Sequence, residues 1–430
     1  MSSLVSGRPP AARTTFLVLA TAVTAVVTLQ RIAIPFGEEQ VPLSMPVVLV
    51  GIGYLLLAGQ LVEDRPRTGL YLFAISLCLA AALVSFVVNA VEASFGSVLL
   101  LVVLYAPFAY VLRSELHALY GRLLDFFCQL MVIGAILSLG QWVAQMLGWR
   151  YTDLLADVVP SSLLLENYNT AYPIRYGSEI YKSNGIFFLE PSFCSQFLAL
   201  AAIIQLVRGG KRWRLPVYAA GILPTVAGTG LLLLAVGFML ISLHRRAIWS
   251  FAVLAVTVLA TTLVAITPAG DLFAERTQET TTRGSSFSLR FVEPYEIAYD
   301  DLGADTRTPF TGRGPGYTQR RADADFQRTE RMLLFPVVPK LVAEYGLIAA
   351  LAFTLFTVYA FCARVPSLTI ALSILFMHLT LSGSLLQPTT VYLSLLLTSV
   401  FATAVPFAGA VRVTRRLVMP PLPARGASGP

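Results

Sequence analysis

One carboxylate lies where the chain changes from polar to apolar. Glu190 is followed by Pro191, which favours the first turn of a helix, and then by an apolar run over residues 193–207. At such a boundary a carboxylate can accept a proton from a bound hydroxyl group. It can equally complement the positive end of the helix dipole. Residue types and spacing leave both interpretations open.

Several cations could bind an anion near this carboxylate. Arg175 and Lys182 precede it in one polar segment, and Arg290 and Arg313 lie in another. The rigid guanidinium fork of arginine matches the oxygens of a phosphate group. The alternative for each arginine is a surface ion pair, which contributes little, because residues 268–331 hold nine arginines among eleven acids.

Two further acidic groups are weaker candidates. Glu344 could act as a second base, but Lys340 lies four residues earlier on the same helical face and could pair with it. Asp323 and Asp325 have the spacing of a metal-binding motif, yet such spacing is common in acidic segments. Neither a metal site nor a cofactor is predicted. The acidic pair at 38–39 could be catalytic, although a solvated loop is the favoured interpretation.

The elements that position these residues must be membrane helices. Of the 430 residues, 56% are hydrophobic and only 13% are charged, whereas a soluble domain has roughly a quarter of its residues charged. A bilayer core takes about 20 apolar residues per helix. We therefore expect an all-α polytopic membrane protein with about 12 transmembrane helices. The expected spans are 16–30, 46–62, 69–88, 97–112, 126–147, 193–207, 215–227, 228–243, 247–267, 341–363, 365–383 and 389–411.

Short basic clusters between these spans predict their orientation. If the N-terminus is cytoplasmic, each cluster falls on the cytoplasmic side, as the positive-inside rule requires. Both termini are then cytoplasmic, and two long polar segments face the periplasm. The expected organisation is helices 1–5 in 1–147, a periplasmic loop in 148–192, helices 6–9 in 193–267, a second periplasmic loop in 268–340, helices 10–12 in 341–411 and a cytoplasmic tail in 412–430. The 29 residues of 215–243 fit this parity only as two short helices that turn between Pro224 and Gly230.

Five short motifs, in order, resemble bacterial exopolysaccharide and O-antigen polymerases, which share a superfamily with O-antigen ligases. They extend over about 180 to 350 and are Gly185–Ser192 (GIFFLEPS), Ala227–Leu234 (AGTGLLLL), Ser288–Arg290 (SLR), Gly312–Gly316 (GRGPG) and Leu341–Leu347 (LVAEYGL). Lys182 stands where the family often has arginine, and Arg175 could replace that function.

The resemblance implies a polymerase that joins undecaprenyl-diphosphate-linked oligosaccharides at the outer face of the inner membrane. It implies Glu190, Arg290 and Glu344 as catalytic residues. For the diphosphate and sugar it implies Arg175, Lys182, Arg313, Gly312 and Gly314. A chain-length regulator and a flippase are implied as possible partners, and a nucleic acid is not.

Two other functions remain as alternatives. A ligase would move finished polymer onto an acceptor, but the ligase-type members carry an outward-facing histidine, and Phe335–Pro339 stands in that region here. The three histidines, His117, His244 and His378, are expected at the cytoplasmic side or within a span. A flippase would place ionisable groups inside the bundle, whereas the expected spans are nearly free of charge.

Overall fold

The computed structural model describes residues 10–36, 39–89, 93–165, 168, 170–174, 177–245, 288–329, 333–381 and 385–405. Its larger helices are α1 Pro10–Thr28, α2 Ser44–Leu57, α3 Arg65–Asn89, α4 Phe95–Tyr105, α5 Tyr120–Met146, α7 Pro191–Arg208, α8 Arg214–Ile222, α9 Gly228–Arg245, α16 Val337–Cys362, α17 Leu368–Phe376 and α18 Pro388–Leu397. Shorter or polar helices are α6 Leu154–Val158, α12 Ser288–Phe291, α13 Glu293–Ala304, α14 Thr308–Thr311 and α15 Tyr317–Thr329.

The expected helical membrane architecture is present, but twelve full-length spans are not confirmed. Among the described residues, five helices are long and apolar enough to cross a bilayer, in α1, α3, α5, α7 and α16. The apolar helices α2, α4, α9, α17 and α18 are shorter. The expected span 247–267 and the tail 412–430 lie outside the described residues.

Two small antiparallel strand pairs interrupt the helices, which the sequence did not predict. Strand β1 (Ala33–Phe36) pairs with β2 (Glu39–Pro42), and β3 (Leu61–Glu63) pairs with β4 (Tyr110–Leu112). The second pair joins segments on either side of α3 and α4, and it brings the start of α3 beside the segment that leads into α5. Strand pairing satisfies the backbone groups of connections that have no helix to do so.

Arginines mark one end of the bundle, which we call the basic end and define by Arg67, Arg208 and Arg364. Arg67 is fully buried, pairs with Asp64 and donates to two backbone carbonyl groups beside α16 and α18. Arg364 also pairs with Asp64, at 2.6 Å. The Arg208 guanidinium lies against Gly121 at the start of α5. Basic clusters that are far apart in the sequence therefore lie together at this end of the bundle.

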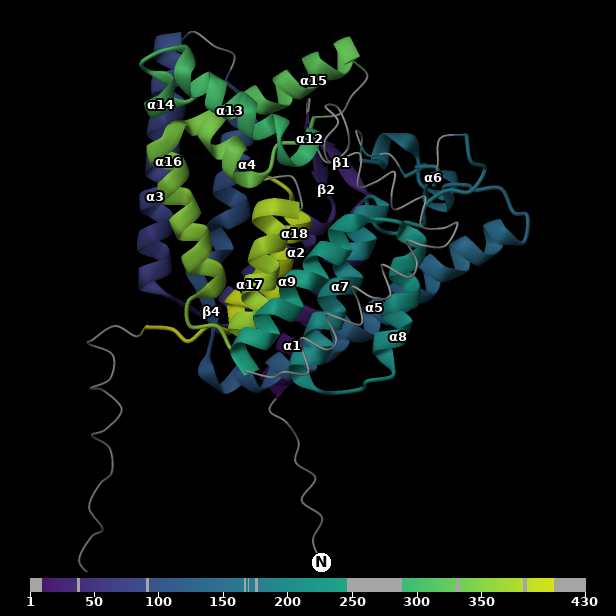
Figure 1. The fold of residues 1–430 in the computed structure, drawn as a ribbon. Helices are drawn as coiled ribbons and strands as arrows, with labels where there is room; N and C mark the ends of the chain where they lie inside the picture. Colours follow the sequence, from purple (N-terminus) through teal and green to yellow (C-terminus); the bar gives the residue numbers. More distant parts are fainter. Residues whose placement is uncertain are drawn as a thin grey trace, which may run out of the picture.

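A short hairpin of helices occupies the middle of the bundle. Figure 1 shows α17 and α18 surrounded by α2, α7, α9 and α16. Every residue of α18 is buried, so this helix contacts protein on all sides. Leu385 and Gln387, which precede α18, are buried as well.

The break expected in 215–243 is present. Helix α8 ends at Ile222, one 3₁₀ turn follows over Leu223–Thr225, and Val226 adopts a left-handed backbone before α9 begins. Gly230 then packs against Ser195 of α7 so closely that a Cβ atom would lie 2.6 Å from its side chain. Whether α8 crosses the bilayer stays a prediction.

Polar helices cover the end of the bundle opposite the basic end. Figure 1 shows α12 to α15 at the top of the bundle, above α16 and beside the upper end of α3, with α6 at the same end. The described part of the second polar segment is thus a folded layer of helices rather than an irregular loop. The described parts of both predicted outer segments lie at the same end of the molecule.

Candidate active site

Glu190 occupies the N-cap position of α7, but its side chain does not cap the helix. Its backbone is extended, with φ −146°, and its carboxylate accepts no backbone N–H from the first turn. Instead, Oε2 accepts hydrogen bonds from the Ser192 hydroxyl and from the Arg290 guanidinium, both at 3.0 Å. The residue is only 4% exposed. No described residue is hydrogen-bonded to Oε1, so this oxygen can accept a proton.

Arg290 reaches Glu190 from the short helix α12, a hundred positions later in the chain. The preceding residue, Leu289, accepts a backbone hydrogen bond from Leu334 at 3.2 Å, and Ser288 donates to Glu293 at 2.8 Å. These contacts fix α12 between α13 and the segment before α16. The Arg290 side chain is 21% exposed, so it combines an ion pair with access to the outside. The structure brings these two predicted residues together.

Two tyrosines and Lys182 lie around this ion pair. Lys182 donates its backbone N–H to the Tyr172 carbonyl, and its ammonium group lies 5.8 Å from the centre of the Tyr172 ring. Burial raises the pKa of Tyr172 to about 12, with a further increase from Glu190 and an opposing effect of Arg290. The pKa of Tyr168 is raised for the same reasons. Both hydroxyl groups therefore remain protonated donors within the field of the ion pair.

Gln387, the residue just before α18, contacts one of these two tyrosines. Its amide donates to the Tyr168 hydroxyl at 3.4 Å, and its carbonyl oxygen is buried without a hydrogen-bond partner among the described residues. A buried amide oxygen without a partner costs about 1–3 kcal/mol. This acceptor lies beside Tyr168, so the polar groups around the ion pair include one whose hydrogen-bonding capacity is unused among the described residues.

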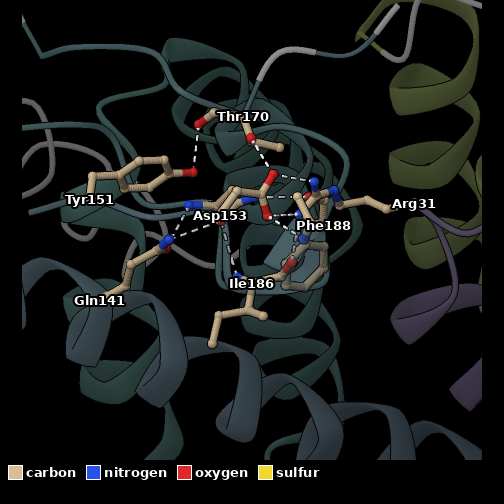
Figure 2. Close-up of polar contacts among 9 residues, drawn as sticks. Arg31, Gln141, Tyr151, Asp153, Thr170, Ile186 and Phe188 are labelled. Atoms are coloured by element: carbon tan, nitrogen blue, oxygen red, sulfur yellow. Dashed lines mark hydrogen bonds and ion pairs between the residues drawn. The ribbon is translucent and has the colours of Figure 1, made fainter. Parts of the chain in front are cut away.

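One ion pair fixes the segment that carries these tyrosines (Figure 2). Arg31, just beyond α1, pairs with both oxygens of Asp153 and donates to the Ile186 carbonyl at 3.3 Å. Thr170 donates to the same carboxylate at 2.8 Å, and Tyr151 donates to the Thr170 carbonyl at 2.9 Å. Burial opposes ionisation of Asp153, but the hydrogen bonds from Arg31 and Thr170 outweigh it and lower its pKa. Thr170 lies between Tyr168 and Tyr172, so this network sets their position.

Two glutamines of α5 hold the segment that leads to Glu190. Gln145 accepts the Tyr181 N–H at 2.7 Å, and Gln141 accepts the N–H groups of Asn184 and Gly185 at 3.1 and 3.2 Å. Ile186 then has φ +68°, a conformation that costs a β-branched residue on the order of 1–3 kcal/mol. Its N–H is hydrogen-bonded to the Asn184 side chain at 3.1 Å. The chain therefore turns sharply just before the carboxylate.

The remaining predicted cations and acids form a second cluster. Glu344 is fully buried, pairs with Lys340 at 3.3 Å and accepts the Thr318 hydroxyl at 2.5 Å. Arg313 lies 3.5 Å from Asp301 and 3.6 Å from Asp305. Among the described residues, neither Glu344 nor Arg313 forms a hydrogen bond or ion pair with Glu190 or Arg290.

The remaining predicted cation, Arg175, lies outside the described residues.

Gly312 and Gly314 pack against α16 rather than around an open space. The Arg313 N–H donates to the Ala343 carbonyl at 2.7 Å, and the Gly314 N–H donates to the Glu344 carbonyl at 3.1 Å. Helix α16 accepts this turn because it is kinked at Gly346, which has φ +77°. The GRGPG motif is therefore a close backbone contact between the outer layer and the bundle.

Replacing Gly312 with alanine is expected to destabilise the protein by about 3 kcal/mol. Its φ is +66°, and an added Cβ would lie 2.4 Å from the Glu344 carbonyl carbon. Thermal unfolding of the purified variant in detergent measures this loss. Gly303→Ala is the matched control, since an added Cβ at Gly303 meets nothing within 4 Å. Equal stability of the two variants would contradict the packing role.

The structure describes only part of the two weaker acidic candidates, Asp323 with Asp325 and the pair at 38–39. Asp323 lies on α15, where it accepts a hydrogen bond from Gln319 at 3.0 Å. Among the described residues, no group of three His, Cys, Asp or Glu side chains could hold a metal ion. In the 38–39 pair, Glu38 lies outside the described residues and Glu39 begins β2.

The arrangement is a buried carboxylate paired with a partly exposed guanidinium, with tyrosines, an ammonium group and an amide around it. A family model, the WcaD colanic acid polymerase, matches residues 17–404. The chain belongs to this family. Membership indicates a glycosyltransferase-type polymerase of exopolysaccharide repeat units and a location in a membrane. No curated protein and no solved structure matches the chain.

Sequence reasoning missed several residues that shape this site. Tyr168, Tyr172 and Gln387 belong to no motif, and nothing in their spacing relates them to Glu190. Gln141 and Gln145 gave a usable signal, because two amides four residues apart on one face of an apolar helix are unusual. The sequence gave no sign that these amides bind the backbone of residues 181–185.

Proposed function

We propose that this protein polymerises an exopolysaccharide by joining undecaprenyl-diphosphate-linked oligosaccharide repeats. The observation that carries the proposal is the 3.0 Å ion pair between Glu190 and Arg290. It combines a candidate base with a candidate diphosphate ligand in a chain of a polymerase family. Hydroxyl, amide and ammonium groups around it suit a sugar and its diphosphate.

In the proposed step, one lipid-linked chain is the donor and one lipid-linked repeat is the acceptor. The acceptor hydroxyl oxygen forms a bond to the anomeric carbon of the donor sugar, and the bond from that carbon to the diphosphate oxygen breaks. The hydroxyl proton passes to Glu190, and undecaprenyl diphosphate leaves with the electron pair. Oε1 is the accepting atom, since Oε2 already binds Ser192 and Arg290.

Arg290 serves both groups in this proposal. A guanidinium has five N–H donors, and the contact with Glu190 uses one of them. The remaining donors can bind the diphosphate and stabilise the charge that develops on it. Lys182 and Arg175 are proposed as further cations for the diphosphate. Arg313, Gly312, Gly314 and Glu344 are proposed to act indirectly, by holding the outer layer of helices on α16.

The proposed location of the reaction is the periplasmic face of the inner membrane. The basic end contains Arg67, Arg208 and Arg364, and the ion pair lies at the opposite end. The positive-inside rule assigns the basic end, and with it both termini, to the cytoplasm. A flippase that delivers the repeats and a chain-length regulator are proposed as partners. Like the proposed substrate, they follow from membership of a polymerase family.

Purified protein incubated with lipid-linked repeats is expected to give a ladder of longer lipid-linked products. A polymerase needs only these repeats, whereas a ligase needs a separate acceptor and gives no ladder without it. A flippase leaves the size of the repeats unchanged. Absence of a ladder, with product formed only on adding a second acceptor, would establish the ligase alternative instead.

Reporter fusions test the proposed face independently of activity. Fusions at Gly148 and at Asp305 should report the periplasm, because both lie at the end that carries the ion pair. Fusions after Arg65 and after Arg212 should report the cytoplasm. A cytoplasmic signal at Asp305 would place the site on the side where the repeats are assembled and would contradict the proposal.

A further inference from the structure

A hollow of about 460 Å³ lies at the basic end, far from the candidate active site. It is formed between α1, the first turns of α5 and the end of α7. Its lining includes Phe16, Arg122, Asp125, Phe126, Gln129 and Arg208. Gly121 also lines it, and the Arg208 guanidinium lies against this part of α5. The hollow therefore has both charged and aromatic walls.

The charge of this hollow is positive. Arg214, almost fully buried on α8, binds the Asp125 carboxylate at 2.7 Å and the Gln129 amide oxygen at 2.9 Å. The one acidic group of the lining is thus already neutralised. In the described part of the chain, no carboxylate lies within ion-pair distance of Arg122 or Arg208. Two guanidinium groups remain to attract an anion.

The aromatic wall continues into the surface that faces lipid. The Arg122 guanidinium lies 4.3 Å from the centre of the Phe16 ring, and Phe16 packs edge-on against Phe126. On the same two helices, Leu17, next to Phe16, and Ile136, farther along α5, are 55% and 59% exposed. Apolar side chains exposed on long membrane helices contact acyl chains. The hollow therefore lies where the apolar face meets the charged end.

We propose that this hollow binds the phosphodiester headgroup of an anionic phospholipid, with an acyl chain along α1 and α5. Arg122 and Arg208 bind the phosphate oxygens through their planar forks, as arginine does in phosphate sites. Phe16 and Phe126 contact the start of the acyl chain. Basic pockets between membrane helices on the cytoplasmic side are known to take acidic headgroups. Since α7 carries Glu190 at its other end, the lipid would stabilise the helix that holds the site.

The test measures retention of phosphatidylglycerol by the purified full-length protein, using native mass spectrometry in detergent. Phosphatidylglycerol should be retained and phosphatidylcholine should not. The Arg122→Gln/Arg208→Gln variant should bind phosphatidylglycerol roughly 30-fold more weakly, at about fivefold per arginine. Arg212→Gln is the matched control, because Arg212 is exposed at the same end and does not line the hollow.

Several outcomes would overturn the proposal. Equal retention of the two lipids would show that the acyl chains alone bind. Equal loss in the Arg212→Gln control would show a diffuse charge effect without a site. Displacement of the lipid by millimolar inorganic phosphate would identify a free phosphate as the ligand. If the double variant is poorly folded, single Arg122→Gln protein must lose the thermal stabilisation that phosphatidylglycerol gives the wild type. None of these measurements depends on polymerase activity.

Discussion

Glu190→Gln protein is expected to accumulate normally in membranes while polymer formation falls roughly 10²-fold or more. Glutamine keeps the shape of the side chain and can still accept the hydrogen bonds of Ser192 and Arg290 through its amide oxygen. It cannot take a proton from the acceptor hydroxyl. Since Glu190 makes no side-chain cap to α7, loss of a cap cannot explain a large defect. The product is measured as a ladder of lipid-linked chains made by purified protein.

Glu179→Gln provides the control for this substitution. Glu179 lies in the same outer segment and is exposed, so the same chemical change there should leave the ladder intact. An undiminished ladder from Glu190→Gln would leave the carboxylate with a purely structural role. If Glu190→Gln protein does not accumulate in membranes, Glu190→Asp is assayed in its place. Aspartate keeps the carboxylate on a side chain one carbon shorter and should retain partial activity.

The sequence predicted the pieces of this site better than their assembly. Hydropathy located the helices, and Pro191 correctly indicated that α7 begins beside Glu190. Nothing local related Glu190 to Arg290, because α12 is held by tertiary contacts of Leu289 and Ser288 rather than by its own four residues. Long-range positioning of this kind has no periodic signal. Only the order of the motifs indicated that the two residues belong together.

The number of spans could not be predicted from apolar content, for a physical reason. Helix α18 is apolar because protein surrounds it, and a lipid-facing helix is apolar because acyl chains surround it. The two environments select the same residues, so a hydropathy pattern cannot separate them. Length distinguishes them only when the helix ends are known. The apolar helices α17 and α18 lie within two of the expected spans, and hydropathy gave no sign that Gln387, just before α18, contacts Tyr168.

The glycines of the GRGPG motif illustrate a related ambiguity. Gly-rich turns between cations are typical of phosphate sites, and Gly312 and Gly314 were predicted to line one. In the structure, Gly312 makes room for the backbone of α16, and Gly314 binds a carbonyl group of that helix. A close approach needs glycine whether the approaching group is a ligand or a helix. The sequence alone indicates a close approach to these glycines, but not whether a ligand or a helix makes it.

Arg290→Ala protein is expected to lose activity by on the order of 10²–10³-fold, the usual cost of removing a donor that stabilises transition-state charge. Arg290→Lys should recover little, because an ammonium keeps the charge but lacks the planar fork that can contact Glu190 on one side and bind the diphosphate bidentately on the other. Arg328→Lys, at the exposed end of α15, is the control that should remain active. Full activity of Arg290→Lys would exclude a bidentate role and favour simple charge attraction.

The double variant separates a joint role from two independent ones. If Glu190 and Arg290 act as one unit through their 3.0 Å contact, Glu190→Gln/Arg290→Lys should be about as inactive as the worse single variant, because the second change removes a function already lost. Independent roles predict that the two losses multiply. The ladder assay, normalised to folded protein, measures all four forms. A multiplicative loss would mean that the ion pair organises the resting site and that base and diphosphate ligand then work separately.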